Sequence, residues 1–437
     1  MQLTTERFQF LADALHGTGG FADGSYLKRY PREGDRKYTA RKELAWYANP
    51  VRRAVSRFVG HIDKRPPIRV LENPLMDVIS DDCDWRGNSI GVFWHRFMME
   101  AKARGTMLLL IDAPAELPAN RAEQEDMRAA PYLVPILPEH VEEYELDHRG
   151  LITSVRYADT MDLDGERVDV SRVWDTEGWR VLKGDEVLES GEHGLGLCPV
   201  LAFSETGEFG AEGSFSQLAD LGKRLYNLHS ELDELLRSQT FSILTYQVPP
   251  EQSQTFDANS MAETLGTHNM LVHSGTMPAF ISPTSIPTEA YFKAIERLQQ
   301  TIDEVALNVE PPDQAESGLA MTLRFQSLNA SLASFARSME DLERRVWEIV
   351  ARWLDITDRT QIEWPTDYGL ADLGSEIELY QQMQMMGAPE SYLREKMRQI
   401  IATDLAATDR DLRDSILGDL DTMSHERPGE PPAVGGE

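Results

Sequence analysis

The chain has 437 residues, of which 41% are hydrophobic and 27% charged, a composition typical of a globular protein and not of a disordered one. The formal net charge is −30, which argues against a protein that grips DNA phosphates over much of its surface. Two interpretations of the charge stay open: the chain never meets nucleic acid, or it surrounds DNA without holding it tightly. Only two cysteines occur, which excludes a disulfide framework and a cysteine-rich zinc site.

The first residues lack the basic-then-apolar pattern of a signal peptide. The longest apolar runs, such as residues 107–111, are too short to cross a bilayer. We therefore expect no membrane association, and we expect the chain to remain in the cytoplasm in which it is made.

Residues 1–70 are predicted to be helical, with a helix ending at Pro66-Pro67, since proline cannot continue it. Residues 28–65 form the one basic stretch of this acidic chain. Two readings of this stretch remain: a surface for DNA or for an acidic neighbouring subunit, or a solvated helix face with intramolecular ion pairs. The glycine-rich residues 17–20 are interpreted as a linker, because no strand precedes them and no G-K-[ST] follows.

Residues 90–104 are predicted to form an amphipathic helix that Gly105 ends, followed by a buried strand over 106–112. Residues 131–200 read as short β segments, with a hairpin turn at Asp164-Gly165. Acidic residues alternate around this turn, but the glycine spacing and distal glutamate of an EF-hand are missing, so we predict no metal there.

Two amphipathic helices flank a polar, proline-dotted insert at residues 246–288, in which 270–273 reads as a short strand. The first helix, over 213–245, carries a heptad-like seam made of Leu218, Leu221, Leu225, Leu228, Leu232 and Leu235. The second helix, over 289–308, is expected to present on one side Phe292, Ile295, Leu298, Ile302 and Val305.

Residues 309–318 contain two prolines and a glycine and are predicted to be a loop. The helix that follows begins near Leu319 and runs past Trp353, on the order of 50 Å in length. A short strand is expected at 361–364, and two or three helices over 375–423 with a break near Gly387-Ala388-Pro389. The tail from residue 428 onward is rich in Pro and Gly and is predicted to be disordered.

No catalytic motif is present in the sequence: it has no phosphate-binding G-x-x-x-x-G-K-[ST] loop, no H-E-x-x-H, no C-x-x-C and no G-x-S-x-G. Acidic pairs such as Asp81-Asp82 are common, but in so acidic a chain they carry little information. We predict a protein that is not an enzyme, with no catalytic residues, no metal and no cofactor.

The order of the predicted elements, together with several local motifs, resembles the portal proteins of tailed bacteriophages, in a branch that long carried an uncharacterised-domain label. The motifs span nearly the whole chain: Tyr26-Leu27-x-Arg29-Tyr30-Pro31-x-Glu33, Tyr38-x-x-Arg41, Gly60-x-x-x-Lys64-Arg65-Pro66-Pro67, Gly105 to Asp112, Pro131-Tyr132-Leu133-Val134, His193-Gly194-Leu195-Gly196-x-x-Pro199-Val200 and Ser317-Gly318-Leu319-Ala320.

The resemblance implies an α+β portal fold in which the chain divides into a wing, two stem helices, a clip, a tunnel loop and a crown. The wing would comprise 1–212 and, with the long helix, 319–374. The stem helices would be 213–245 and 289–308, packed through Leu218, Leu221, Leu225, Leu228, Leu232, Ile295, Leu298 and Ile302. The clip would be 246–288, the tunnel loop 309–318, and the crown with its tail 375–437.

The resemblance also implies a function. Subunits would form a ring, commonly a dodecamer, at one vertex of the virion capsid, and double-stranded DNA would pass through its channel during packaging and ejection. The partners would be other copies of the chain, the terminase large subunit, a head–tail adaptor protein and the major capsid protein. The residues expected to project toward DNA are Glu310, Pro311, Pro312, Asp313, Gln314, Ala315, Glu316 and Ser317. They carry three carboxylates and no lysine or arginine, so we expect DNA to slide past them.

Two alternatives from other classes share parts of this pattern. An acidic helical scaffolding protein without DNA passage would also carry the leucine seams, but it leaves the order of helix, insert, helix and loop unexplained. A nucleic-acid enzyme would use the basic stretch 28–65 for substrate and acidic pairs for magnesium. Observation of a ring with an open channel would argue against the first alternative. Magnesium-dependent cleavage of DNA would support the second.

Overall fold

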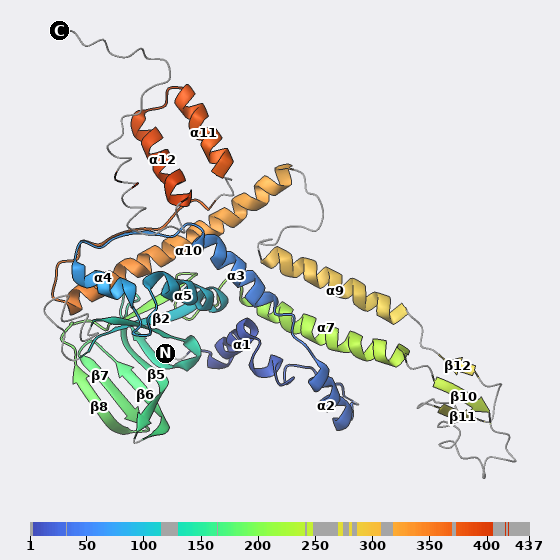
Figure 1. Cartoon of the computed structure of the whole chain (residues 1–437). Helices are drawn as coiled ribbons and strands as arrows, with labels where there is room; N and C mark the ends of the chain where they lie inside the picture. Colours follow the sequence, from blue (N-terminus) through green and yellow to red (C-terminus); the bar gives the residue numbers. More distant parts are fainter. Residues whose placement is uncertain are drawn as a thin grey trace, which may run out of the picture. The chain divides into compact units, whose positions relative to one another are not determined.

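The computed structural model describes residues 3–31, 33–114, 130–163, 165–240, 243–247, 270–273, 279–281, 286–306, 318–368, 373–404, 416 and 418. The fold is α+β, as predicted. The chain divides into two compact units (Figure 1). The first unit comprises Met1–Thr5, Val55–Gly213 and Leu307–Glu437, and the second comprises Glu6–Ala54 and Ser214–Ala306.

The centre of the first unit is the helix–strand pair that the sequence predicts. Helix α5 (Ile90–Arg104) buries one face that includes Phe93, Trp94 and Phe97, and it ends at Gly105, whose φ of 81° is left-handed. Strand β2 (Thr106–Asp112) follows at once and is buried along nearly its whole length. Both predictions are confirmed. A left-handed C-cap turns the chain sharply, which explains why helix and strand need no connecting loop.

Strand β2 is the middle strand of an antiparallel sheet with β3 (Tyr132–Ile136) and β9 (Val200–Ser204) on either side. One face of this sheet meets the helices, as the contact of Phe203 with Phe97 and with Phe335 shows. The other face contributes Leu108 and Leu110 to a separate core cluster. Because both faces of β2 are covered, its sequence is apolar throughout and does not alternate.

A five-stranded antiparallel meander covers that second face. Its strands are β4 (Val141–Leu146), β5 (Ile152–Leu163), β6 (Glu166–Trp174), β7 (Gly178–Lys183) and β8 (Glu186–Glu192). Its inner side chains, among them Tyr144, Val155, Tyr157 and Trp174, pack against Leu108 and Leu110. The pairing of Leu163 with Glu166 leaves a two-residue connection between β5 and β6, which confirms the predicted hairpin. The first unit therefore has three layers: helices, a three-stranded sheet and a five-stranded sheet.

The helix layer is dominated by α10 (Gly318–Trp353), which has 36 residues, close to the predicted bounds. Its Phe335 contacts Phe58 of α3 (Pro50–Asp63), and Trp353 donates a hydrogen bond of 3.0 Å to the Ile111 carbonyl in β2. Helix α4 (Pro74–Asp81) contacts α5. Strand β1 (Ile68–Val70) pairs antiparallel with β13 (Gln361–Glu363), which brings together residues far apart in sequence.

Helices α11 (Leu373–Met385) and α12 (Glu390–Asp404) form a helical hairpin. Tyr380, Leu393 and Ile400 form the buried cluster between the two helices. The turn between them contains Gly387, whose φ is 75°. The predicted break near Gly387-Ala388-Pro389 is confirmed.

In the described part of the first unit, Lys102 and Arg104 are buried with carboxylates, and the half-buried Arg69 pairs with a buried one. Arg104 meets Glu139 at 2.8 Å and 2.5 Å and also pairs with Glu100, one turn earlier in α5. Lys102 meets Glu205 at 2.6 Å and lies over the rings of Phe58 and Phe335. Arg69 meets Glu343 at 2.5 Å, and the Trp364 indole donates to the same carboxylate. Such groups are kept in the interior only when paired, because burial of a lone charge is costly.

The second unit consists of α1 (Thr5–His16), the short 3₁₀ helix η1 (Gly19–Phe21), α2 (Asp35–Leu44), α7 (Ser216–Thr240) and α9 (Ile286–Val305), with a small sheet between the last two helices in sequence. In that sheet β10 (Ile243–Gln247) pairs parallel with β11 (Met270–His273) and antiparallel with β12 (Ala279–Ile281). The sequence interpretation grouped residues 1–212 together, whereas residues 6–54 pack with 214–306. The glycine-rich stretch is also more than a linker, since Gly20 is buried against the Tyr26 ring.

Several sequence predictions fall outside the described residues. These are Asp164 of the hairpin turn, residues 309–317 of the predicted loop 309–318, most of the insert 246–288, any helix beyond 404 and the tail from 428 onward.

Candidate functional site

The candidate site is built on α7 and α9, which lie side by side in the second unit (Figure 1). Of the eight side chains that the sequence places at this packing interface, six are buried and two, Leu221 and Leu228, are half-buried. The buried six are Leu218, Leu225, Leu232, Ile295, Leu298 and Ile302. Helices α7 and α9 contact each other, and the spacing of three and four residues places these side chains on one face of each helix, which explains why both segments are helical.

Phe292 does not lie where the sequence places it. Its side chain is 53% exposed, and the neighbouring Tyr291 turns toward α7 instead. The Tyr291 hydroxyl donates a hydrogen bond of 3.0 Å to Glu231 of α7. At 3.6 residues per turn, position 291 lies closer to the stripe of 295, 298 and 302 than position 292 does. Apolar character favours Phe292 over Tyr291, but the helical phase places Tyr291 on the packing face.

Glu231 connects three elements of the second unit. It accepts the hydrogen bond from Tyr291 of α9. Burial raises the pKa of the Tyr30 phenol in the N-terminal segment, and the nearby Glu231 carboxylate raises it further. Burial and Glu231 likewise raise the pKa of Tyr291. Tyr30 in turn lies under the Arg41 guanidinium, 4.4 Å from ring centroid to Cζ. One half-buried carboxylate therefore joins the N-terminal segment to both long helices.

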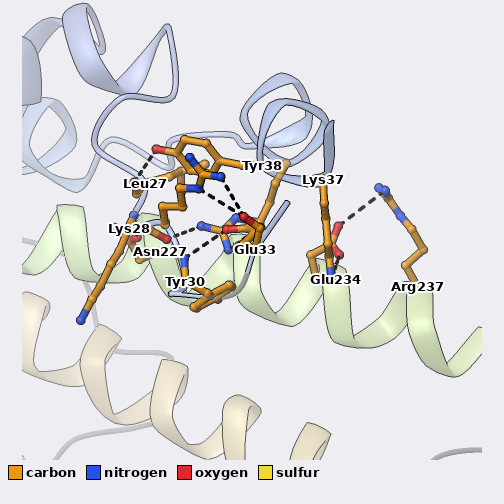
Figure 2. A network of polar contacts seen from close by, with 11 residues as sticks. Leu27, Lys28, Tyr30, Glu33, Lys37, Tyr38, Asn227, Glu234 and Arg237 are labelled. Carbon is orange, nitrogen blue, oxygen red and sulfur yellow. Dashed lines mark hydrogen bonds and ion pairs between the residues drawn. The ribbon is translucent and has the colours of Figure 1, made fainter. Parts of the chain in front are cut away.

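The N-terminal segment 26–41 is fixed along α7 by backbone hydrogen bonds, which Figure 2 shows. The Lys28 amide donates to the Asn227 side chain at 2.7 Å, and the Asn227 amide group donates to the Tyr26 carbonyl at 3.2 Å. The Tyr38 hydroxyl donates to the Leu27 carbonyl at 3.0 Å. The Asn227 side chain thus plays the part that a neighbouring strand plays in a sheet. It satisfies one backbone donor and one backbone acceptor of a stretch that has no regular secondary structure.

Arg41 is the anchor of this segment. It is only 3% exposed, its guanidinium donates to the Lys28 carbonyl, and it lies 3.2 Å from the equally buried Glu33. Glu33 also accepts a hydrogen bond from the Tyr30 amide at 3.2 Å. Arg29 bonds to the Glu33 carbonyl and to Asp35. The tyrosine, arginine and glutamate of the motif over 26–41 therefore pack on one another.

These contacts show how part of the basic stretch 28–65 is used. Lys37 pairs with Glu234 of α7 at 3.3 Å, where Arg237 also reaches the same carboxylate (Figure 2). Lys42 lies over the Tyr38 ring, and Arg65 donates to the Asp367 carbonyl in the first unit. Of the two readings left open, intramolecular pairing describes Arg29, Lys37 and Arg41.

Aromatic rings hold α1 and η1 against α7. Phe21 stacks on Tyr47 at 3.8 Å between centroids and meets Tyr26 and Tyr226 edge to face. At the start of both helices, Arg7 and Asp220 form a two-pronged ion pair with distances of 2.9 Å and 2.7 Å. Packed aromatic rings bury a large apolar area and prefer a few relative orientations, so they fix α1 and η1 against α7.

Replacing Glu231 with leucine should lower the thermal unfolding midpoint of the second unit, because the Tyr291 hydroxyl loses its acceptor. We expect the free energy of unfolding to fall by about 1 kcal/mol, a value kept small because Glu231 is half-exposed. The matched control is Glu304→Leu on α9, an exposed carboxylate for which the described structure shows no contact; it should leave the midpoint nearly unchanged. Thermal unfolding followed by tryptophan and tyrosine fluorescence measures both, and equal shifts would contradict the connecting role of Glu231.

Within the described part of the chain, no group of three or more His, Cys, Asp or Glu side chains is arranged to hold a metal ion. Cys83 and Cys198 are free and buried. Burial raises the pKa of Cys198 to about 12 and that of Cys83 still further, so both remain thiols. No described helix is long and apolar enough to cross a membrane.

The comparisons with known proteins give similarities in structure. No protein-family profile matches the chain, and no curated protein matches it in sequence. Its structure is similar to a protein in the virion of a native gene transfer agent particle, with 12% identity, a TM-score of 0.43, and coverage of 87% of this chain and 95% of that one.

A second similarity is to a protein in the neck of the native gene transfer agent particle computed with C12 symmetry, with 13% identity, a TM-score of 0.40, and coverage of 93% of this chain and 99% of that one. A third is to an HK97-family phage portal protein from Corynebacterium diphtheriae, with 10% identity, a TM-score of 0.36, and coverage of 72% and 92%.

Proposed function

We propose that the chain is a portal subunit: it assembles into a closed ring at one vertex of a phage-like capsid, and double-stranded DNA passes through the ring. The observation that carries the proposal is the order of elements around α7 and α9. Two packed helices flank a small three-stranded sheet in sequence, and the 36-residue α10 follows after residues 307–317. This is the order that the sequence resemblance assigns to stem, clip, stem, tunnel loop and wing helix.

Exposed apolar side chains of the second unit support assembly. Trp46 is 54% exposed, Phe292 53% and Leu44 51%, and Leu236 near the end of α7 is also exposed. Large exposed apolar side chains are typical of surfaces that a partner covers. A neighbouring subunit in a ring would cover them, and a repeated head-to-tail contact closes into a ring when its rotation is right.

The path of DNA follows from the same proposal. Residues 310–317 would project into the channel, where Glu310, Asp313 and Glu316 repel the phosphates and let the duplex slide. Residues 246–288 would receive the terminase large subunit during packaging and a head–tail adaptor protein afterwards, and the outer part of the first unit would meet the major capsid protein. In this assignment the protein is a conduit and not an enzyme.

The mass of the purified full chain in solution tests the proposal. We expect one discrete oligomer of about a dozen chains, with a mass that does not grow with protein concentration, because a closed ring has no free ends. Mass photometry over a wide concentration range measures this. An open-ended series of masses would favour the scaffolding alternative, and a monomer that persists even with the capsid shell protein present would overturn the portal assignment.

A further inference from the structure

The helix pair of α7 and α9 presents two side surfaces, one on each side of its packed stripes. The two helices run in opposite directions (Figure 1). In antiparallel right-handed helices, positions whose helical angle is roughly 90° greater than that of the packed stripe lie on one side of the pair, and positions roughly 90° behind it lie on the other. The Phe292 side consists of His229, Asp233, Leu236, Phe292 and Glu296. The Arg297 side consists of Arg224, Glu231, Ala290, Ala294 and Arg297.

Two aromatic residues of the N-terminal segment extend these sides. Trp46 stacks on His229 with 4.7 Å between ring centroids and 21° between planes, so it belongs to the Phe292 side. Tyr30 lies beside Glu231, so it belongs to the Arg297 side. His229 and Glu231 are about 160° apart around α7, which places the two aromatic residues on opposite sides of the helix.

The Phe292 side combines apolar surface with negative charge. Trp46 is 54% exposed, Phe292 53% and Leu236 38%. Its charged residues, Asp233 and Glu296, are both exposed, and neither carboxylate forms an ion pair within the described chain. Apolar side chains that are exposed together in this way are typical of a surface that a partner covers.

The Arg297 side carries positive charge that the chain does not neutralise. Arg224 and Arg297 are exposed, and among the described residues neither has an ion-pair partner. The carboxylates nearest to them are already engaged, since Glu231 accepts the Tyr291 hydroxyl and Asp220 is held by the two-pronged ion pair at the start of α7. The two side surfaces are therefore opposite in the sign of their unpaired charges.

The two sides also match in height along the helices. Phe292 is two positions from both Ala290 and Ala294, about 3 Å along the axis, and Glu296 is about 1.5 Å from Arg297. A second copy set side by side, without a shift along the axis, thus brings the Phe292 ring onto two exposed alanines, whose small side chains leave room for it. The same placement brings Glu296 opposite Arg297.

We propose that the Phe292 side of one copy packs against the Arg297 side of the next copy, with Phe292 on Ala290 and Ala294 and with Glu296 paired to Arg297. This contact rests on the proposed ring function and names its subunit interface. It joins two different surfaces of the same chain, so it is heterologous, the type of contact that closes into rings. It covers exposed aromatic rings and pairs charges that have no partner within one chain.

A charge swap on α9 tests the contact without changing the composition of the chain. Glu296→Arg sets an arginine opposite Arg297, and Arg297→Glu sets a glutamate opposite Glu296, so each single variant should associate at least about threefold more weakly per contact. The double variant with both substitutions pairs opposite charges again and should regain the wild-type oligomer. The control is Lys293→Glu, an exposed position of α9 turned away from α7, which should assemble as the wild type does.

Replacing Phe292 with serine tests the apolar part of the contact. Phe292→Ser should weaken association about tenfold per contact, because the subunits then have less apolar surface to bury. The matched control is Val187→Ser in β8 of the first unit, where the valine is 52% exposed; it should leave assembly unchanged. Mass photometry over a range of concentrations measures every variant, and circular dichroism with thermal unfolding verifies that each is folded.

The outcomes separate this contact from the ring itself. Rings formed equally well by the wild type, Phe292→Ser and both single charge variants would overturn the assigned contact and leave the portal proposal standing. Folded single variants that dissociate together with the double variant would also overturn it, since opposite charges then fail to restore the interface. A wild-type chain that stays monomeric even with the capsid shell protein present would overturn contact and ring together.

Discussion

Replacing Gly105 with alanine is expected to lower the free energy of unfolding by about 4 kcal/mol, because two penalties coincide at this position. Its φ of 81° is left-handed, and a Cβ built on it would lie 1.9 Å from the backbone nitrogen of Gly213. Gly213 cannot withdraw easily, since its amide donates to the Arg104 carbonyl at 3.1 Å and the Gly105 carbonyl accepts from Glu205 at 2.8 Å. Chemical denaturation of the purified protein measures the loss.

Gly150 is the matched control for backbone conformation. It has the same φ of 81° in the turn between β4 and β5, but a Cβ there would have no atom within 4 Å. Gly150→Ala should cost only about 1 kcal/mol, the strain of a left-handed alanine alone. Equal losses at Gly105 and Gly150 would show that the close approach of Gly213 has no energetic weight.

Replacing Arg104 with methionine should also cost about 4 kcal/mol, because it leaves the Glu139 carboxylate buried without a partner. The Arg104 side chain is 1% exposed and that of Glu139 is 4% exposed. The exposed Arg344, which pairs with Glu340 at 2.7 Å, is the matched control, and Arg344→Met should cost less than about 1 kcal/mol. The same denaturation experiment measures both variants.

Adding Glu139→Leu to the Arg104→Met variant should restore part of the lost stability, since the unpaired charge is removed with its former partner. We expect a coupling of about 2 kcal/mol in the double-mutant cycle. Additive losses would mean that the two side chains act independently and that burial of the carboxylate is not the cause.

The long elements were predictable because each carries a local signal. The leucine spacing predicts α7, and the apolar run after Gly105 predicts β2, because each pattern can be read from neighbouring residues alone. The break near Gly387 was equally local, as only glycine adopts its left-handed φ readily.

The packing of residues 6–54 against α7 could not be read from the sequence, because it depends on single contacts between distant positions. The hydrogen bond from the Lys28 amide to Asn227, for example, leaves no periodic pattern in the sequence. The same is true of the pairing of β1 with β13 in the first unit. Strands of three residues are too short to alternate visibly, and a buried Arg41 looks the same in sequence as an exposed one.

For the candidate site, the packing leucines and isoleucines were visible, whereas Glu231 and Tyr291 were not, because a polar pair inside an apolar stripe interrupts the pattern instead of forming it.

Electron cryo-microscopy of the purified oligomer tests whether this chain forms a ring with an open channel. We predict a closed ring in which α7 and α9 of successive copies surround a central channel wide enough for duplex DNA. Residues 310–317 should face the lumen. A filled, two-fold symmetric or open-ended assembly would contradict the account.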